Sequence, residues 1–259
     1  MTTRILVTGA TGNVGRELLA QLSEVEVVTP QRDRVDLARP ESLRDCLRGV
    51  DAVFLLWPLH SGAALPGVLA EIARHARRVV FLGSGGVRDL SMDRQEELIR
   101  RCGLEWTVLR PSTFAVNTRW WAGQIRAGDQ VRGSHGGLGM ALLHEADIAA
   151  VAVRALTADG HHGRVYRLTG PAVLSQAEQV RILGEVLGRP LRWVELDRPA
   201  ARAQLIADGI PLSFVDVLLD AYATMAAQPD PEITADVAAV TGRPARTFRQ
   251  WVADHRAEF

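Results

Sequence analysis

The stretch that decides the fold is residues 4–22, RILVTGATGNVGRELLAQL, near the start of the chain. Its first part, residues 5–7, is a short apolar run that predicts a buried strand. From residue 16 the leucines recur three and four residues apart, and this spacing predicts a helix. Between the two, Gly9, Gly12 and Gly15 form a Gly-x-x-Gly-x-x-Gly turn. A strand, a glycine-rich turn and a helix in this order are the context of the dinucleotide-binding fingerprint.

Each glycine has its own role in such a fingerprint. Gly9 takes the tight turn, Gly12 lets the backbone approach a pyrophosphate, and Gly15 lets the helix pack closely on its strand. The amides and the dipole at the helix start favour the negative charge of a phosphate. The alternative is a vestigial or purely structural turn, because turns need glycine in any case. We expect the turn to bind a dinucleotide through Gly9, Thr11, Gly12, Asn13, Val14 and Gly15.

The composition is that of an ordinary globular protein. The chain has 259 residues, of which 47% are hydrophobic and 23% charged. Its net charge is zero and it has no basic tail, so we expect a small-molecule partner rather than a nucleic acid. The chain starts directly in a strand and has no apolar stretch long enough for a bilayer, so we expect neither a secretion signal nor a membrane partner. Two widely separated cysteines, Cys46 and Cys102, indicate reduced thiols in a cytoplasmic protein.

Strands and helices alternate through the first half of the chain. This alternation predicts an α/β fold with a doubly wound parallel sheet of the Rossmann type, which binds ligands at the carboxyl ends of its strands. We place the Rossmann core in residues 1–133. A smaller, mostly helical region, residues 134–259, is expected to complete part of the sheet and cover the substrate cleft. The strands expected in the first half are residues 5–7, 25–29, 35–37, 51–57, 78–82 and 106–109.

The second half is less regular. A glycine-rich loop is expected at residues 133–139, a helix at 147–156, a strand at 165–169 and a small outer strand at 191–196. Ser175-x-x-Glu178 and Thr247-x-x-Gln250 are capping boxes that open helices.

The residues after the second strand bear on the choice of dinucleotide. A Rossmann protein places an acidic residue there for the ribose hydroxyls of NAD, or an arginine for the extra phosphate of NADP. No acidic residue follows Thr29 directly, and Arg32 and Arg34 come soon after it. This favours NADP(H), with NAD(H) possible. The alternative is that both arginines are solvated loop residues.

Six blocks of the chain together resemble the NmrA-like group of atypical short-chain dehydrogenases, and the resemblance runs over nearly the full length. The blocks are residues 8–15, 81–87, 96–111, 114–117, 144–149 and 168–171. The resemblance implies a Rossmann domain, a smaller C-terminal region and a cleft for NADP(H) or NAD(H). It also implies positions for several residues around this cofactor. Asp36 and Leu37 would lie near the adenine; Leu56, Trp57, Pro58 and Ser84 would border the ribose and nicotinamide; Pro111 to Phe114 would line the nicotinamide pocket.

The chemistry expected of this chain differs from that of ordinary short-chain dehydrogenases, which pair a tyrosine with a lysine for proton donation. The chain has no lysine, and its two tyrosines, Tyr166 and Tyr222, lie far in sequence from the helix that carries this pair in ordinary short-chain dehydrogenases. Hydride transfer itself needs only alignment of nicotinamide and acceptor. A quinone or conjugated carbonyl gains a stabilised anion that solvent can protonate, so we expect a reductase of small aromatic, quinonoid or conjugated acceptors.

Two other functions occur in the resembling family and stay open at this point. One is a non-catalytic protein that reports NAD(P) status to a partner. The other is a non-redox tailoring enzyme, such as a cyclase, on the same fold. A homodimer is possible for any of these.

Few polar residues are candidates for catalysis. Ser84, at a predicted strand end, can bind a substrate carbonyl or serve as a cofactor or turn contact. His144 can donate a proton or orient the substrate, or it can be a structural histidine at the helix that follows. His161 and His162 lie in a turn, and we expect no metal site there.

The expected substrate pocket is largely aromatic. Trp120 and Trp121 either wall such a pocket or simply pack in the core. Met92 occupies the place where related reductases carry a lysine or histidine. The residues expected to contact substrate are Met92, Phe114, Asn117, Trp120, Trp121 and His144.

Overall fold

The structure, a computed structural model, describes residues 2–31, 34–83 and 89–259. The chain forms two compact units that interleave along the sequence. Unit 1 contains Met1–Pro111, Glu145–Leu168 and Ala235–Arg243; unit 2 contains Ser112–His144, Thr169–Thr234 and Pro244–Phe259. The sequence-based division has one boundary near residue 133, whereas the chain passes between the two units five times.

Unit 1 is built on a six-stranded sheet in which every neighbouring pair is parallel, in the order β2-β1-β3-β4-β5-β8. This confirms the doubly wound fold. The strands are β1 (Arg4–Val7), β2 (Glu26–Val28), β3 (Ala52–Leu56), β4 (Arg78–Leu82), β5 (Glu105–Pro111) and β8 (Arg164–Leu168). The helices are α1 (Asn13–Gln21), η1 (Pro40–Leu43), α2 (Arg44–Leu47), α3 (Leu65–Ala73), α4 (Met92–Arg100), α6 (Glu145–Thr157) and α10 (Asp236–Thr241).

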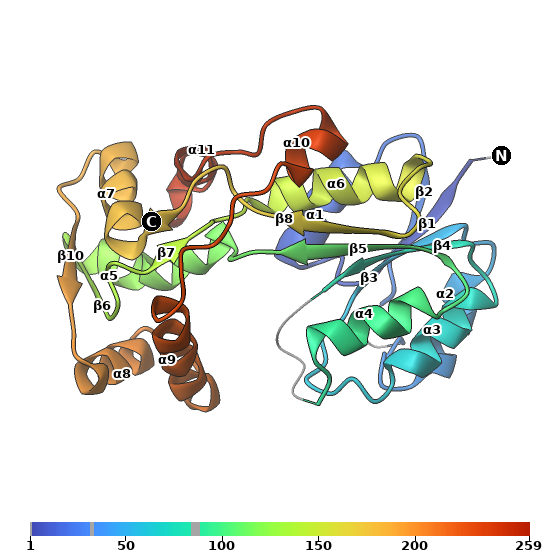
Figure 1. Ribbon diagram of the computed structural model, residues 1–259, viewed down its shortest axis with the longest axis horizontal. Helices are drawn as coiled ribbons and strands as arrows, with labels where there is room; N and C mark the ends of the chain where they lie inside the picture. The colour runs from blue at the N-terminus through green and yellow to red at the C-terminus, as the bar shows by residue number, and fades with distance from the viewer. Residues whose placement is uncertain (1, 32–33, 84–88) are drawn as a thin grey trace. The chain divides into compact units, whose positions relative to one another are not determined.

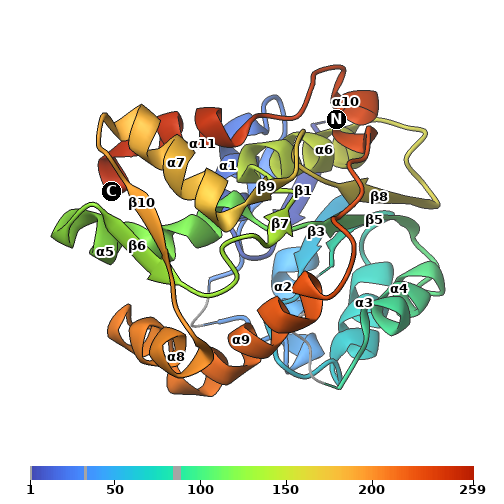
Figure 2. The same cartoon turned by 60° about the vertical axis from the view of Figure 1, so that its left-hand side comes forward.

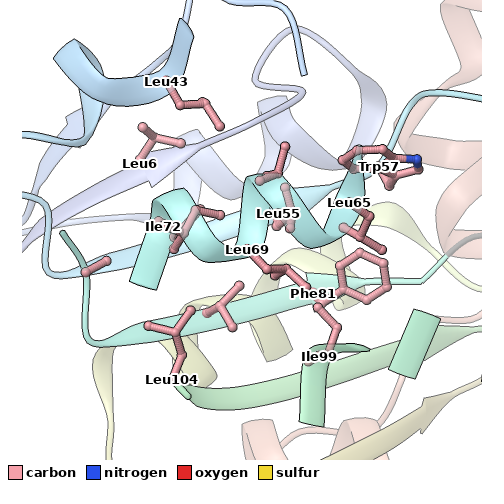
Figure 3. Close-up of a cluster of buried hydrophobic side chains, with 14 of the residues drawn as sticks. Leu6, Leu43, Leu55, Trp57, Leu65, Leu69, Ile72, Phe81, Ile99 and Leu104 are labelled. Atoms are coloured by element: carbon pink, nitrogen blue, oxygen red, sulfur yellow. The ribbon is translucent and has the colours of Figure 1, made fainter. Parts of the chain in front are cut away.

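Helices cover both faces of this sheet. Figure 1 shows α1, α6 and α10 on one face and α2, α3 and α4 on the other. The strands are buried on both sides, as the long apolar runs of β3 and β4 require. On the α3 face, Leu55 and Phe81 lie close to Leu65 and Leu69, and Leu6 lies beside Leu43 in the same buried cluster (Figure 3).

Residues 35–37 do not form the strand that the sequence predicted. The hydroxyl of Ser42 bonds both the N–H and the C=O of Asp36, at 3.0 and 2.9 Å. The Asp36 carboxylate accepts the N–H of Ala38. These local bonds hold the backbone in a loop, because the polar groups that a strand would offer to a neighbour already have partners. As a result β2 is the edge strand and is only partly buried.

The strand order also locates the point where the chain reverses direction across the sheet. The chain passes from β1 outward to β2 and then returns to β3 on the other side of β1. Open α/β sheets bind ligands at such a switch point, outside the carboxyl ends of the two strands. In this chain those ends are the glycine turn after β1 and the segment that begins at Leu56.

Unit 2 is mostly helical, with two small sheets: β6 and β10 are parallel, and β7 and β9 antiparallel. Figure 2 shows α7 along β10 and α8 beside α9. Its core gathers residues of α5, α7 and α11, including Ile125, Leu183 and Trp251. The elements are η2 (Ala115–Trp121), α5 (Ala122–Ala127), β6 (Gln130–Gly133), β7 (Gly139–Met140), β9 (Leu174–Ser175), α7 (Gln176–Leu187), β10 (Arg192–Glu195), α8 (Arg198–Ala207), α9 (Leu212–Ala226), α11 (Phe248–Asp254) and η3 (Arg256–Glu258).

Both predicted capping boxes are confirmed: Ser175 and Glu178 cap α7, and Thr247 and Gln250 cap α11. No described helix is long and apolar enough to cross a membrane.

Candidate functional site: a glycine turn and an aromatic pocket

The glycine turn of unit 1 is tied to both strands of the switch point. Gly9 has φ +68°, a conformation that glycine adopts without strain. Just before it, the Thr8 hydroxyl accepts the N–H of Leu56 at 2.8 Å and lies 3.2 Å from the carbonyl oxygens at the end of β3. The Leu56 side chain covers Gly9, since a Cβ atom there would lie 3.3 Å from it. The turn is therefore fixed against the end of β3.

Gly15 permits the start of α1 to approach the turn. A Cβ atom at Gly15 would lie 2.1 Å from the carbonyl oxygen of Gly9, a distance that no side chain tolerates. Gly12 is the N-cap of α1, and its N–H donates to the Gly9 carbonyl at 2.9 Å. The first turn of α1 has no acidic residue, and the N-cap contributes no side-chain bond. This helix start is suited to a phosphate group, which the helix dipole and the backbone amides favour.

The other predicted cofactor contacts in unit 1 differ in how accessible they are. Asp36 is half-exposed and forms an ion pair with Arg39, whereas Leu37 is buried in the core. The Trp57 side chain is also buried, and its indole N–H donates to the Ser61 carbonyl at 3.0 Å. Only the backbone of Trp57 is then available to a ligand, while Pro58 is exposed. Arg32 and Ser84, on which the cofactor preference and a catalytic contact were predicted, lie outside the described residues.

Four predicted substrate residues come together in unit 2. Phe114, Asn117, Trp120 and Trp121 line one pocket with a volume of about 410 Å³. Phe114 forms a bridge with Leu143 just before η2, and this contact fixes the start of that short helix. The pocket size is that of typical small-molecule sites.

Both tryptophans of this pocket are also packed against neighbours. Trp120 meets the ring of Phe214 edge-on with centroids 6.3 Å apart, and Trp121 meets Trp193 in the same way at 5.8 Å. Such edge-to-face pairs hold the rings in place. The two alternatives for these residues are thus compatible, because each ring packs on one side and lines the pocket on another.

No described residue that lines this pocket carries a charge at neutral pH. The lining combines four aromatic rings with aliphatic and methionine side chains and a few neutral polar groups. Two of these groups already bind the backbone: the Ser112 hydroxyl donates to Ala141 and the Thr118 hydroxyl to Ala115. The arrangement suits a flat, uncharged ligand.

The lining residues that the sequence did not anticipate include Tyr222 of α9 and Gln176 and Gln179 of α7. Burial raises the pKa of Tyr222 to about 12, so its phenol stays protonated. The structure assigns no hydrogen bond to the Tyr222 hydroxyl from the described part of the chain. The sequence carried one signal for the two glutamines. They are three residues apart, so they share one face of the helix with Leu183.

His144 and Met92 lie elsewhere among the described residues. His144 is buried, its Nε2 is 3.3 Å from the Asp254 carboxylate, and its ring lies against His255, which in turn stacks on Trp251. This geometry favours the structural alternative for His144, which is not among the residues that line the pocket. Met92 opens α4 in unit 1, and a Cβ atom at Gly83 would lie 2.4 Å from its methyl carbon.

Comparison with known proteins gives relatives over the whole length. The chain is 36% identical to the (4-alkanoyl-5-oxo-2,5-dihydrofuran-3-yl)methyl phosphate reductase of Streptomyces griseus, over 98% of this chain and 99% of the relative. It is 32% identical to an NAD(P)H azoreductase from Xenophilus azovorans, with the same shares covered. No protein-family model matches the chain.

A solved structure with the same fold is the NADPH-dependent quinone oxidoreductase from Escherichia coli in complex with NADPH. Its TM-score is 0.79 at 20% identity, over 97% of this chain and 99% of that one. This likeness shows the fold, including the helical region that follows the sheet.

Proposed function

Since the chain belongs to the NmrA-like group of atypical short-chain dehydrogenases/reductases, a family of NAD(P)-binding oxidoreductases, we propose that it reduces small, uncharged aromatic or quinonoid acceptors with NADPH. The observation that carries the proposal is the aromatic pocket, whose described lining residues carry no charge. The glycine turn at the switch point of the sheet supplies the second requirement, a place for a dinucleotide.

The cofactor is held by the residues of unit 1 that the sequence already indicated. The amides from Gly12 onward bind the pyrophosphate, and Gly15 gives α1 its close approach to the turn. Arg32 or Arg34 binds the extra phosphate of NADP(H), and the backbone of Leu56 to Pro58 borders the ribose. When bound, the reduced nicotinamide supplies the hydride. NADH is the alternative cofactor, because the relative from Xenophilus azovorans is by name an NAD(P)H azoreductase.

The residues of the pocket orient the acceptor. Phe114, Trp120 and Trp121 offer faces and edges to a flat ring, because aromatic pairs gain from such contacts. The neutral phenol of Tyr222 donates a hydrogen bond to the acceptor oxygen on which negative charge develops. Solvent then provides the proton, since the chain has no lysine and hence no tyrosine–lysine relay.

The same pocket disfavours anionic acceptors. A phosphate or sulfonate enclosed without a cation loses its hydration and gains no partner. The relative from Streptomyces griseus is by name the reductase of a compound that carries a methyl phosphate group, and proteins usually recognise phosphate groups with arginine or lysine. We propose that this chain differs from that relative in the charge of its acceptor.

A matched pair of acceptors tests the function. Purified protein is mixed with NADPH and either menadione or a naphthoquinone sulfonate, and NADPH oxidation is followed with an enzyme-free control. We expect kcat/KM for menadione to exceed that for the sulfonate by about tenfold or more, the effect of a single unpaired charge. Equal turnover of both would refute the charge selection, and turnover of neither would refute the reductase assignment.

A fluorescence titration with NADPH and, separately, NADH tests the cofactor. We expect tighter binding of NADPH by about tenfold, because an arginine pairs with its additional phosphate. Tighter NADH binding would refute the roles of Arg32 and Arg34 but leave the reductase assignment intact.

The cysteines and the net charge bear on the cellular setting and the partners of the protein. The cysteines Cys46 and Cys102 are free thiols, which suits a reducing compartment, and we propose the cytoplasm. A neutral net charge supports the absence of a nucleic-acid partner. A homodimer is compatible with this function, and light scattering measures it.

A further inference from the structure

Two glutamines of α7 have fixed orientations at the edge of the aromatic pocket. The Gln176 amide nitrogen donates to the carbonyls of Ser134 and His135, at 2.9 and 3.0 Å. The Gln179 amide nitrogen donates to the carbonyl of Leu174 at 3.1 Å. A flipped amide would put oxygen against oxygen at these contacts, so each side chain has one orientation.

These bonds leave the two amide oxygens without a hydrogen-bond donor among the residues that the structure describes. Gln176 and Gln179 are 2% and 1% exposed, and the described part of the chain donates no hydrogen bond to either Oε1 atom. Neither oxygen is completely enclosed, although both residues line the pocket. A buried acceptor without a donor is costly, and folded proteins satisfy nearly all such groups.

We propose that Gln176 and Gln179 receive a hydrogen bond from the ligand through their Oε1 atoms, so that the pocket selects aromatic molecules with an O–H or N–H group. This inference rests on the proposed function only in taking the pocket as the acceptor site. The ligand class is a neutral phenol, aniline or similar ring donor. A hydroxylated or amino-substituted quinone fits, because its ring carbonyl accepts from Tyr222 while its substituent donates to the glutamines.

Binding of beta-naphthol and of its methyl ether tests the proposal without cofactor or turnover. The two molecules have the same ring and the same oxygen acceptor, but only the naphthol donates a hydrogen bond. Isothermal titration calorimetry on the full-length protein should give the naphthol a dissociation constant about tenfold lower, the effect of one well-satisfied buried acceptor. Equal constants for the two molecules would overturn the proposal, and this result needs no variant.

A substitution then assigns the effect to α7. Gln179→Met keeps the length of the side chain and removes the oxygen, so we expect the preference for naphthol over the ether to fall to about twofold or less. Gln95→Met is the matched control, because Gln95 on α4 of unit 1 also donates to a carbonyl five residues earlier, that of Leu90. An unchanged preference in a folded Gln179→Met protein would refute the role of that residue, and the corresponding Gln176→Met variant tests the other one.

The outcomes separate this inference from the proposed function. A lost naphthol preference in the Gln179→Met protein, together with no NADPH oxidation by any acceptor, supports the pocket chemistry and refutes the reductase. Turnover of menadione, together with equal affinities for naphthol and its methyl ether, supports the reductase and refutes the role of the glutamines.

Discussion

Gly15 is the residue at which sequence and geometry agree most closely. A methyl group there would displace the Gly9 carbonyl, 2.1 Å away, and move the start of α1 off the turn. We predict that Gly15→Ala weakens NADPH binding by about tenfold or more, because overpacking at such a site costs about 1–3 kcal/mol. A titration of both proteins measures this. Gly123→Ala is the control, since α5 leaves open space around a Cβ atom there.

The contradictory outcome is defined by the same pair of variants. If Gly15→Ala and Gly123→Ala bind NADPH equally and as tightly as the parent chain, the turn does not hold the pyrophosphate.

The phenol of Tyr222 is the second residue with a clear consequence. Burial disfavours the phenolate and raises the pKa of Tyr222 to about 12, and burial also raises the pKa of Tyr166. The folded chain retains a proton that the unfolded chain releases near pH 10, so the free energy of unfolding falls as the pH rises from about 10 to about 12. These are the only two tyrosines, so tyrosinate absorbance reports on them alone.

We therefore predict that less than half of the tyrosine is ionised at pH 10 in the folded protein, against half in denatured chain. A spectrophotometric titration checks this, with Tyr222→Phe to assign the component that ionises last. Half-ionisation at pH 10 in the folded protein would contradict the burial of these phenols.

Residues of the candidate site differ in how far the sequence predicted them. Phe114, Asn117, Trp120 and Trp121 follow one another along the chain, so their common pocket was predictable from local spacing. Tyr222 is about a hundred residues further on, and only tertiary packing brings α9 to the same pocket. No short-range pattern encodes that contact.

At the scale of elements, α4 is joined to β5 by a buried carboxylate. Glu96 is 2% exposed, and it binds Arg110 and, at 3.3 Å, Arg100. The bond to Glu96 raises the pKa of Arg110. We predict that Glu96→Ala lowers the free energy of unfolding by about 1.5–3 kcal/mol, because Arg110 loses its buried partner and keeps the exposed Asp93.

Its neighbour Glu97 provides the comparison on the same helix. Glu97 is more exposed and pairs with Arg94 and Arg101 on the surface, where such pairs contribute little. Chemical denaturation of both alanine variants measures the difference. A Glu96→Ala protein as stable as the Glu97→Ala protein would show that the buried pair does not stabilise the unit.

The elements themselves were largely predictable, and the exceptions have physical causes. Helices with capping boxes begin where expected, because the cap bonds are local. Residues 35–37 form no strand because the Ser42 hydroxyl binds the Asp36 backbone from both sides. The alternation of apolar and polar residues at positions 35–37 is typical of a strand, and it does not reveal the bond to Ser42.

At the scale of the whole molecule, the two units share the chain in alternation. The α6–β8 segment returns to unit 1 because β8 pairs with β5 and the Gln21 amide binds the Ala146 carbonyl at 3.0 Å. A single boundary near residue 133 places the α6–β8 segment outside the first region, whereas its contacts are with unit 1. The sequence did predict that the later region completes part of the sheet. Each unit contributes one requirement of the proposed reaction, the glycine turn in unit 1 and the uncharged pocket in unit 2.

The most direct test of this account is the stoichiometry of anaerobic NADPH oxidation by menadione with the purified protein. The account predicts one NADPH consumed for each menadione reduced, in a reaction that saturates with menadione and is strongly reduced in Gly15→Ala and in Trp121→Ala. NADPH that binds tightly but is not oxidised by menadione or any other uncharged quinone would contradict it. That result would instead fit a protein that senses NADPH without reducing anything.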